Sequence, residues 1–62
     1  MKSIYYEIQQ QAGNWTRIGS APQQGTSDQV ISIRLKEYVK RSPVKKARCV
    51  DDSGRVLDIH ME

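Results

Sequence analysis

Residues 26–41 read TSDQVISIRLKEYVKR and predict an amphipathic helix. Four apolar side chains of this stretch fall within about 100° of one another at the repeat of an α-helix. They are Ile31, Leu35, Tyr38 and Val39, with Val30 on the flank of the stripe. Because a stripe of this width is typical of a helix that packs against a core, we expect these residues to be buried. Ile33 projects to the opposite side, where it is either a partner contact or an isolated surface residue of the common kind.

Polar residues and a proline mark the two ends of this helix. Thr26 and Gln29 have the spacing of a capping box, while Ser27 is a competing N-cap. The next proline follows Ser42, and a residue before proline is disfavoured in helical backbone. We therefore expect the helix to end at about Arg41.

The residues before the helix alternate between apolar and polar side chains. Within residues 2–11, Ile4, Tyr6 and Ile8 share one side, and Tyr5 lies on the other. Period-two patterning rich in Ile and Tyr is typical of a half-buried strand. This segment therefore predicts the first strand of the sheet.

The returning strand, residues 15–20, fits two registers. A two-residue turn would place Trp15 on the same face as Ile8. A three-residue loop over residues 12–14 pairs Ile8 with Ile18 instead, and we favour it because it buries two isoleucines together. This second register turns outward the three sheet residues that are candidate partner contacts: Tyr5, Trp15 and Arg17.

Residues 44–50 and 56–61 are predicted strands joined by the sequence DDSG. Gly54 suits the left-handed position that closes a three-residue hairpin loop. The register set by this loop places Cys49 opposite Leu57 and Ala47 opposite Ile59 on the core face. It places Arg48 opposite Asp58 and Lys46 opposite His60 on the other face. Because apolar residues pair with apolar ones and an ion pair forms on the wet side, this register is internally consistent.

These elements together predict an α+β fold of ββαββ order, in which a four-stranded antiparallel sheet carries one helix packed on one face. Residues 1–62 form a single small domain near the lower size limit for folding without a disulfide or metal. Cys49 is the only cysteine, which excludes an intrachain disulfide and is typical of a cytoplasmic protein. The N-terminal residues contain no long apolar run, so we expect neither a signal peptide nor a membrane span.

Positive charge is concentrated in residues 34–48, which hold seven of the ten Lys and Arg residues of a chain with net charge +3. Such a segment attracts polyanions or an acidic protein surface. The candidate polyanion-binding residues are Lys36, Lys40, Arg41, Lys45, Lys46 and Arg48. The competing interpretation is that these charges keep a small domain soluble, since a charged fraction of 27% is ordinary.

No catalytic, metal or cofactor site is predicted. The only thiol, Cys49, and the only imidazole, His60, fall on opposite faces of the predicted sheet, which argues against a nucleophile–base pair. Asp58 shares a face with His60, but the cations Lys46 and Arg48 lie opposite and would repel a metal ion. The four glycines are dispersed and match no phosphate-binding loop. We therefore expect neither an enzyme nor a small-molecule substrate.

A chain without catalytic machinery is expected to act by binding, and three hypotheses remain. The first is a protein partner or a homodimer at the open sheet face, where Trp, Tyr and Arg have the composition of a binding hot spot. The second is nucleic acid bound through residues 34–48. The third is a phage-type inhibitor that occupies the nucleic-acid site of a host protein. The pattern is generally like that of many small bacterial or phage reading frames, which does not separate the three.

Overall fold

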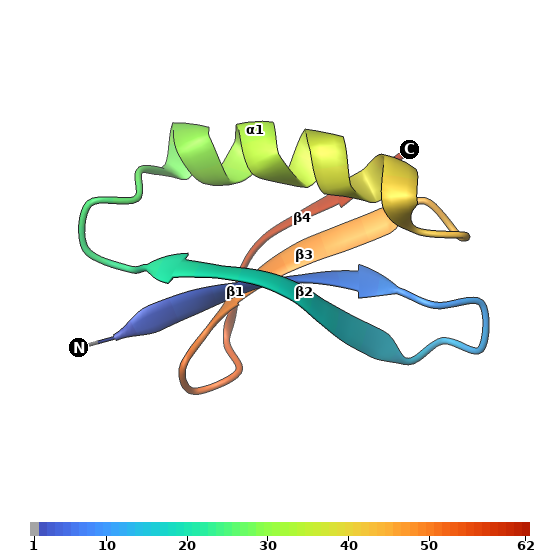
Figure 1. Cartoon of the computed structure of the whole chain (residues 1–62), viewed down its shortest axis with the longest axis horizontal. Helices are drawn as coiled ribbons and strands as arrows, with labels where there is room; N and C mark the ends of the chain where they lie inside the picture. The colour runs from blue at the N-terminus through green and yellow to red at the C-terminus, as the bar shows by residue number, and fades with distance from the viewer. Residues whose placement is uncertain (1) are drawn as a thin grey trace.

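The computed structural model describes residues 2–62 and consists of two β-hairpins with one helical segment between them (Figure 1). The elements are β1 (Ser3–Gln9), β2 (Trp15–Pro22), α1 (Asp28–Tyr38), the short 3-10 helix η1 (Val39–Arg41), β3 (Lys46–Asp51) and β4 (Val56–Met61). All four strands form one antiparallel sheet in the order β2-β1-β3-β4, and α1 lies across one of its faces. The predicted ββαββ fold is therefore confirmed. No helix within residues 2–62 is long and apolar enough to cross a membrane.

The helix begins at a serine and ends where the sequence predicts. The Val30 amide donates to Oγ of Ser27 over 3.3 Å, so Ser27, rather than Thr26, is the N-cap. Thr26 instead donates its hydroxyl to the carbonyl of Pro22 over 2.6 Å. At the other end, α1 continues as η1 to Arg41, directly before the serine–proline pair that stops the helical backbone.

The core lies in a single layer between the sheet and the helical segment. Its buried residues come from β1, α1, η1 and β3: Ile4, Tyr6, Ile8, Ile31, Leu35, Val39, Ala47 and Cys49. The predicted helix stripe is confirmed, with Tyr38 at the margin, where its ring centroid lies 5.3 Å from that of Tyr6. Within residues 2–62, β4 adds no fully buried apolar side chain to this core.

The first hairpin turns through a three-residue loop that lies one position earlier than predicted. Gly13 has a φ of 98° and donates its amide to the carbonyl of Gln10 over 2.9 Å, which closes the loop. Ile8 consequently lies opposite Thr16, so the predicted pairing of Ile8 with Ile18 is wrong. Ile18 is the extra residue of a β-bulge and packs against the margin of the core instead.

The second hairpin has the predicted loop but a different register. Gly54, with a φ of 86°, donates its amide to the carbonyl of Asp51 over 3.0 Å and closes three loop residues. Val50 then pairs with Val56, and Leu57 is the extra residue of a second β-bulge. The pairs beyond the bulge are Cys49 with Asp58, Arg48 with Ile59, Ala47 with His60 and Lys46 with Met61. All four predicted pairs are wrong. The bulge at Leu57 shifts β4 by one residue relative to β3, so the β4 side chains beyond the bulge point to the face opposite to the predicted one.

Candidate partner-binding surface

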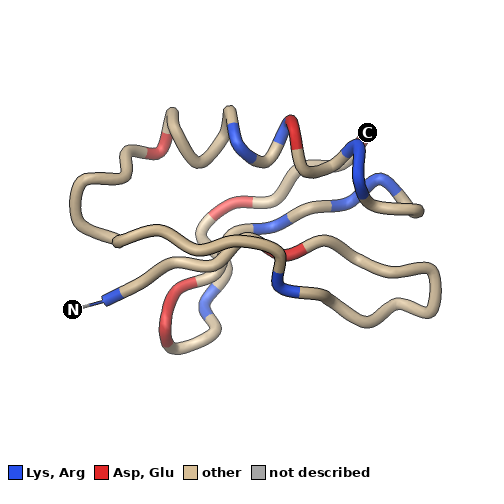
Figure 2. Tube along the Cα trace, viewed as in Figure 1, with Lys and Arg blue, Asp and Glu red and all other residues tan. Residues whose placement is uncertain are grey.

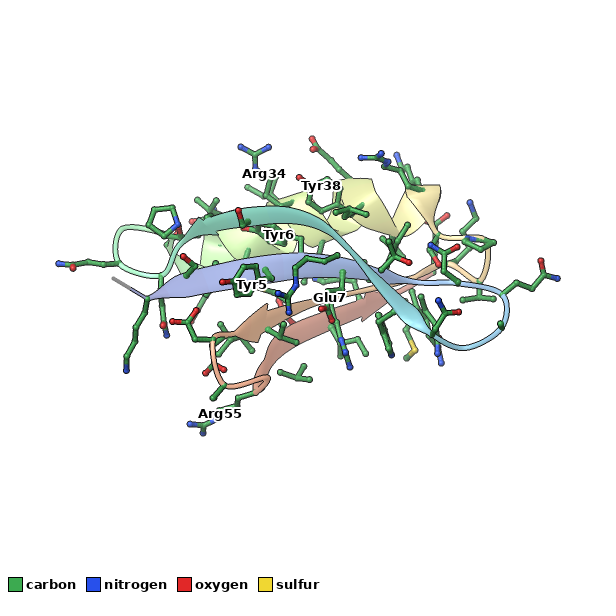
Figure 3. All side chains as sticks on the ribbon, turned by 60° about the horizontal axis from the view of Figure 1, so that its bottom comes forward. Tyr5, Tyr6, Glu7, Arg34, Tyr38 and Arg55 are labelled. Carbon is green, nitrogen blue, oxygen red and sulfur yellow. The ribbon has the colours of Figure 1, made fainter. Side chains whose placement is uncertain are left out.

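The face of the sheet that points away from α1 is not covered by another element of residues 2–62, and we call it the open face (Figures 1 and 3). Its side chains include Trp15 and Arg17 on β2, Tyr5 and Glu7 on β1, Lys46, Arg48 and Val50 on β3, and Val56, Ile59 and Met61 on β4. The predicted outward orientation of Tyr5, Trp15 and Arg17 agrees with this arrangement.

Five side chains of the open face contact one another across β2, β1 and β3. The guanidinium carbon of Arg17 lies 3.9 Å from the centroid of the Tyr5 ring. That of Arg48 lies 4.1 Å from the centroid of the Trp15 ring, and both distances are typical of cation–π contacts. Glu7 accepts from Nε of Arg17 over 3.3 Å and from Nε of Arg48 over 2.8 Å. We call these five residues the arginine–aromatic ladder.

Glu7 is the shielded centre of the ladder, since its side chain is only 10% exposed. A carboxylate removed from water needs charged or hydrogen-bonding partners, and the two arginines supply them. The sequence pattern places Glu7 on the outward side of the first strand but does not distinguish it from other outward residues. Its importance depends on β1 lying between the two strands that carry Arg17 and Arg48, and a residue pattern does not specify strand order.

The ladder limits how the two aromatic rings can be used. Arg17 covers one face of the Tyr5 ring, and Arg48 covers one face of the Trp15 ring. Glu7 holds both guanidinium groups in these positions. A nucleic-acid base would have to displace an arginine in order to stack on either covered face.

Beside the ladder, β4 presents a row of apolar side chains to solvent. Val56 is 47% exposed, Ile59 48% and Met61 66%, and we call these three residues the β4 strip. The register predicted from the sequence places Ile59 and Leu57 on the core face. That assignment is wrong, because the bulge at Leu57 turns Ile59 to the open face and leaves Leu57 exposed. Val50 lies on the same face but is buried.

His60 and Asp58 lie on the helix side of the sheet, opposite to the predicted side. Nε2 of His60 lies 3.2 Å from Oγ of Ser32 in α1 and 3.8 Å from Oδ2 of Asp58. A hydrolytic triad holds serine and aspartate on different ring nitrogens, whereas both contacts here use the same nitrogen. The predicted ion pair between Arg48 and Asp58 does not form, because Arg48 binds Glu7 on the open face.

Cys49 shares the helix side with His60, so the predicted separation of thiol and imidazole on opposite faces is wrong. The thiol is nevertheless completely buried. Burial, reinforced by the nearby carboxylates of Asp58, Asp51 and Glu7, raises the pKa of Cys49 to about 11. A nucleophilic cysteine requires a shift in the other direction, so the geometry assigns this thiol to the core.

The candidate polyanion-binding residues divide into two groups. Around the connection from η1 to β3 lies a group that we call the basic end, consisting of Lys36, Lys40, Arg41, Lys45 and Lys46 (Figure 2). Lys45 donates from Nζ to the carbonyl of Lys40 over 3.0 Å. In the part of the chain that the structure describes, no carboxylate lies within 4.0 Å of any charged group of the basic end. Arg48 belongs to the ladder instead.

Ile33 lies apart from the other three candidate partner contacts. It is 52% exposed on the outer side of α1, whereas Tyr5, Trp15 and Arg17 lie on the far face of the sheet. The structure therefore brings three of the four residues into one surface and leaves Ile33 outside it.

Comparisons of this chain with protein-family models, with curated proteins and with solved structures find no match. Two surfaces of the molecule are candidates for binding: the open face, with its ladder and β4 strip, and the basic end.

Proposed function

We propose that this chain is a non-catalytic binding protein that recognises another protein through its open face. The observation that carries the proposal is the exposed β4 strip of Val56, Ile59 and Met61 beside the arginine–aromatic ladder. Apolar side chains next to Trp, Tyr and Arg have the composition of the energetic centres of protein interfaces. The three apolar residues also occupy successive open-face positions of one strand, and grouped apolar residues mark interaction surfaces more often than scattered ones do.

The arginines of the ladder are held in place before binding, and this supports the proposed function. Immobilising a long side chain on binding costs about 0.5–1.5 kcal/mol, and an arginine that is already held loses less of this entropy. Arg17 and Arg48 are held by Glu7 and by their aromatic neighbours before any partner arrives. Glu7 also offsets part of their charge, so the surface does not select polyanions by charge alone.

The partner can be identified by cross-linking from a position that leaves the ladder and the strip intact. Ser20 lies opposite Tyr5 on the edge of the open face and is exposed. A photoreactive amino acid at position 20 should capture the partner in cells that produce the protein. The matched control carries the same group in place of Ile33, on the outer side of α1. Cross-links from position 33 but none from position 20 would assign binding to the helix and contradict the proposal.

Affinity measurements with the purified partner complete the test. Truncation of an aromatic hot spot costs about 2 kcal/mol or more, so Trp15→Ala should weaken binding roughly 30-fold. Ile33→Ala should leave the dissociation constant unchanged within about twofold, because its side chain lies outside the open face. Equal affinities of the wild type and Trp15→Ala would remove the open face from the interaction.

A second candidate function is nucleic-acid binding, and the unpaired cations of the basic end favour it. Cations without carboxylate partners are free to contact phosphates. If they do, affinity for a short duplex should fall by orders of magnitude between about 50 and 200 mM salt, as it does for about six or more contacts. Reversal of charge at Lys45 and Lys46 should weaken binding to any sequence. Salt-insensitive binding would exclude phosphate contacts.

The inhibitor hypothesis is a special case of protein recognition. A protein that occupies the nucleic-acid site of a host protein needs a complementary surface, and the open face is the surface proposed here. The identity of the captured partner decides this case. A nucleic-acid-binding protein that releases its nucleic acid when this chain is added supports the hypothesis, and an unrelated partner excludes it.

A further inference from the structure

The two edges of the sheet differ in how they are protected. The outer strands are β2 and β4. On β2, the bulge at Ile18 and the terminal Pro22 are features that natural edge strands use against pairing with another chain. The sequence of β4 is VLDIHM, without proline or lysine, and its bulge lies at its start. Residues 58–61 therefore form a regular outer strand.

The backbone groups of Ile59 point away from the sheet. The amide of Glu62 donates to the carbonyl of Lys45 over 3.0 Å. Because the bonding direction alternates along antiparallel strands, His60 and Asp58 also direct their backbone groups toward β3. Ile59 and Met61 direct theirs outward. The Ile59 amide accordingly finds no strand partner and donates to Oδ1 of Asp58 over 2.8 Å.

We propose that a second copy of this chain pairs with this edge, β4 antiparallel to β4, with a two-fold axis at Ile59. The two four-stranded sheets then form one continuous sheet, with both helices on the same side and the two open faces joined. This inference goes beyond the proposed function: it names an occupant for the strand edge. Ile59 and Met61 belong both to the β4 strip and to this edge, so the two proposals are tested with different variants.

Charge selects the register of this pairing. A two-fold axis that keeps matching faces together has to pass between the two copies of one residue. Met61 is the last residue of β4, so an axis there would leave most of the strand unpaired, and Asp58, Ile59 and His60 remain. An axis at Asp58 would oppose two carboxylates, and an axis at His60 would oppose Asp58 to the acidic Glu62. An axis at Ile59 places Asp58 of each copy opposite His60 of the other. These would be the pairs that exchange no hydrogen bonds, in which side chains approach most closely.

Pairing would replace two contacts within each copy by contacts between the two copies. The Ile59 amide would leave the carboxylate of Asp58 and donate to the Ile59 carbonyl of the second copy. Asp58, which already lies 3.8 Å from its own His60, would turn to the imidazole of the second copy. The side chains of Ile59, 48% exposed, would meet at the axis, and Met61 would lie beside Leu57 of the second copy. Their burial favours association.

The first test compares two lysine substitutions at isoleucines of similar exposure, Ile59 and Ile33. Ile59→Lys would set two ammonium groups against each other at the axis, whereas Ile33→Lys makes the same change on α1. Sedimentation equilibrium should show dimers for the wild type and Ile33→Lys, and monomers for Ile59→Lys. Circular dichroism checks that each variant is folded. A wild type that stays monomeric at millimolar concentration, or an Ile59→Lys variant that is still dimeric, would overturn the proposal.

Two further variants test the backbone and the register. Ile59→Pro removes the outward amide, which makes no bond to β3, together with the isoleucine side chain at the axis, and should also give monomers. Asp58→His or His60→Asp alone creates like pairs across the axis and should weaken the dimer about tenfold or more. The double variant Asp58→His/His60→Asp restores both carboxylate–imidazole pairs and should restore the dimer, and failure to do so would exclude this register. Trp15→Ala, which affects the open face, should leave the dimer intact, so the two proposals fail separately.

Discussion

Nε of Arg48 lies 2.8 Å from Oε1 of Glu7, and this contact joins β3 to β1 on the open face of the sheet. The side chains are 27% and 10% exposed, so the pair is shielded more than an ordinary surface salt bridge. Arg17 binds the other oxygen of the same carboxylate from β2. One acid thus links three neighbouring strands through their side chains as well as their backbones.

Replacing Glu7 by Gln should destabilise the protein by about 1–2 kcal/mol, because two arginines lose their charged partner while both keep partial access to water. Urea unfolding at neutral pH measures the loss. The matched control is Glu37→Gln on the exposed side of α1, which should change stability by less than about 0.5 kcal/mol. Equal effects of the two substitutions would mean that the ladder adds nothing to stability.

Trp15→Ala and Leu35→Ala should lower the free energy of unfolding by different amounts, because one side chain lies on the surface and the other in the core. Leu35 is completely buried, and its truncation should cost about 3–5 kcal/mol. Trp15 rests on the open face against Arg48, so its truncation should cost only about 1 kcal/mol. Urea unfolding measures both losses of stability, from the shift of the midpoint and a common slope of the unfolding free energy against urea concentration. A loss at Trp15 as large as that at Leu35 would show that the indole belongs to the core.

The Cys49 thiol should make stability fall at high pH. Its pKa is raised from about 9 to about 11 by burial and then by nearby carboxylates, so the folded state keeps a proton that the unfolded state releases. This contribution is fully present below pH 9 and decreases as the pH rises toward 11. The loss is on the order of 2 kcal/mol in all. The free energy of unfolding should therefore change less between pH 8 and pH 10.5 for Cys49→Ala than for the wild type, since the alanine variant lacks the titrating thiol.

Asp51 should make the second hairpin sensitive to acid. Its carboxylate accepts from Oγ of Ser53 over 2.7 Å and from the amides of Ser53 and Arg55 over 2.9 Å each. The Ser53 hydroxyl first, and then the Arg55 amide, lower the pKa of Asp51. The resulting stability is present above the ordinary value of 3.8 and is lost as the pH falls through the lowered one. In Asp51→Asn, urea midpoints between pH 5 and pH 2 should depend less on pH, and an unchanged dependence would contradict this role.

Several features of the fold were predictable because they depend on neighbouring residues. The stripe of Ile31 and Leu35 follows from the helical repeat, and the end of the helix follows from the position of Pro43. The loop that Gly54 closes follows from the left-handed backbone that glycine adopts without strain. The alternation of Ile4 and Tyr6 predicts which side of β1 faces the core.

The candidate site was only partly predictable. Tyr5, Trp15 and Arg17 were singled out correctly as outward residues, but Glu7, which organises them, was not. Nothing local to Glu7 distinguishes it from any acid on a strand. It becomes important because β1 lies between β2 and β3, which places arginines on both of its sides.

The amino-acid order alone determined the sequence of elements, the helix stripe and the loop that Gly54 closes, because each of these depends on interactions within a few residues. Strand order and the bulges at Ile18 and Leu57 were decided only by the tertiary structure. A bulge depends on how two distant segments pack against a common core, and one extra residue reverses every side chain beyond it. For that reason Ile59 lies on the open face and His60 lies beneath the helix, whereas the unbroken pattern predicts the opposite.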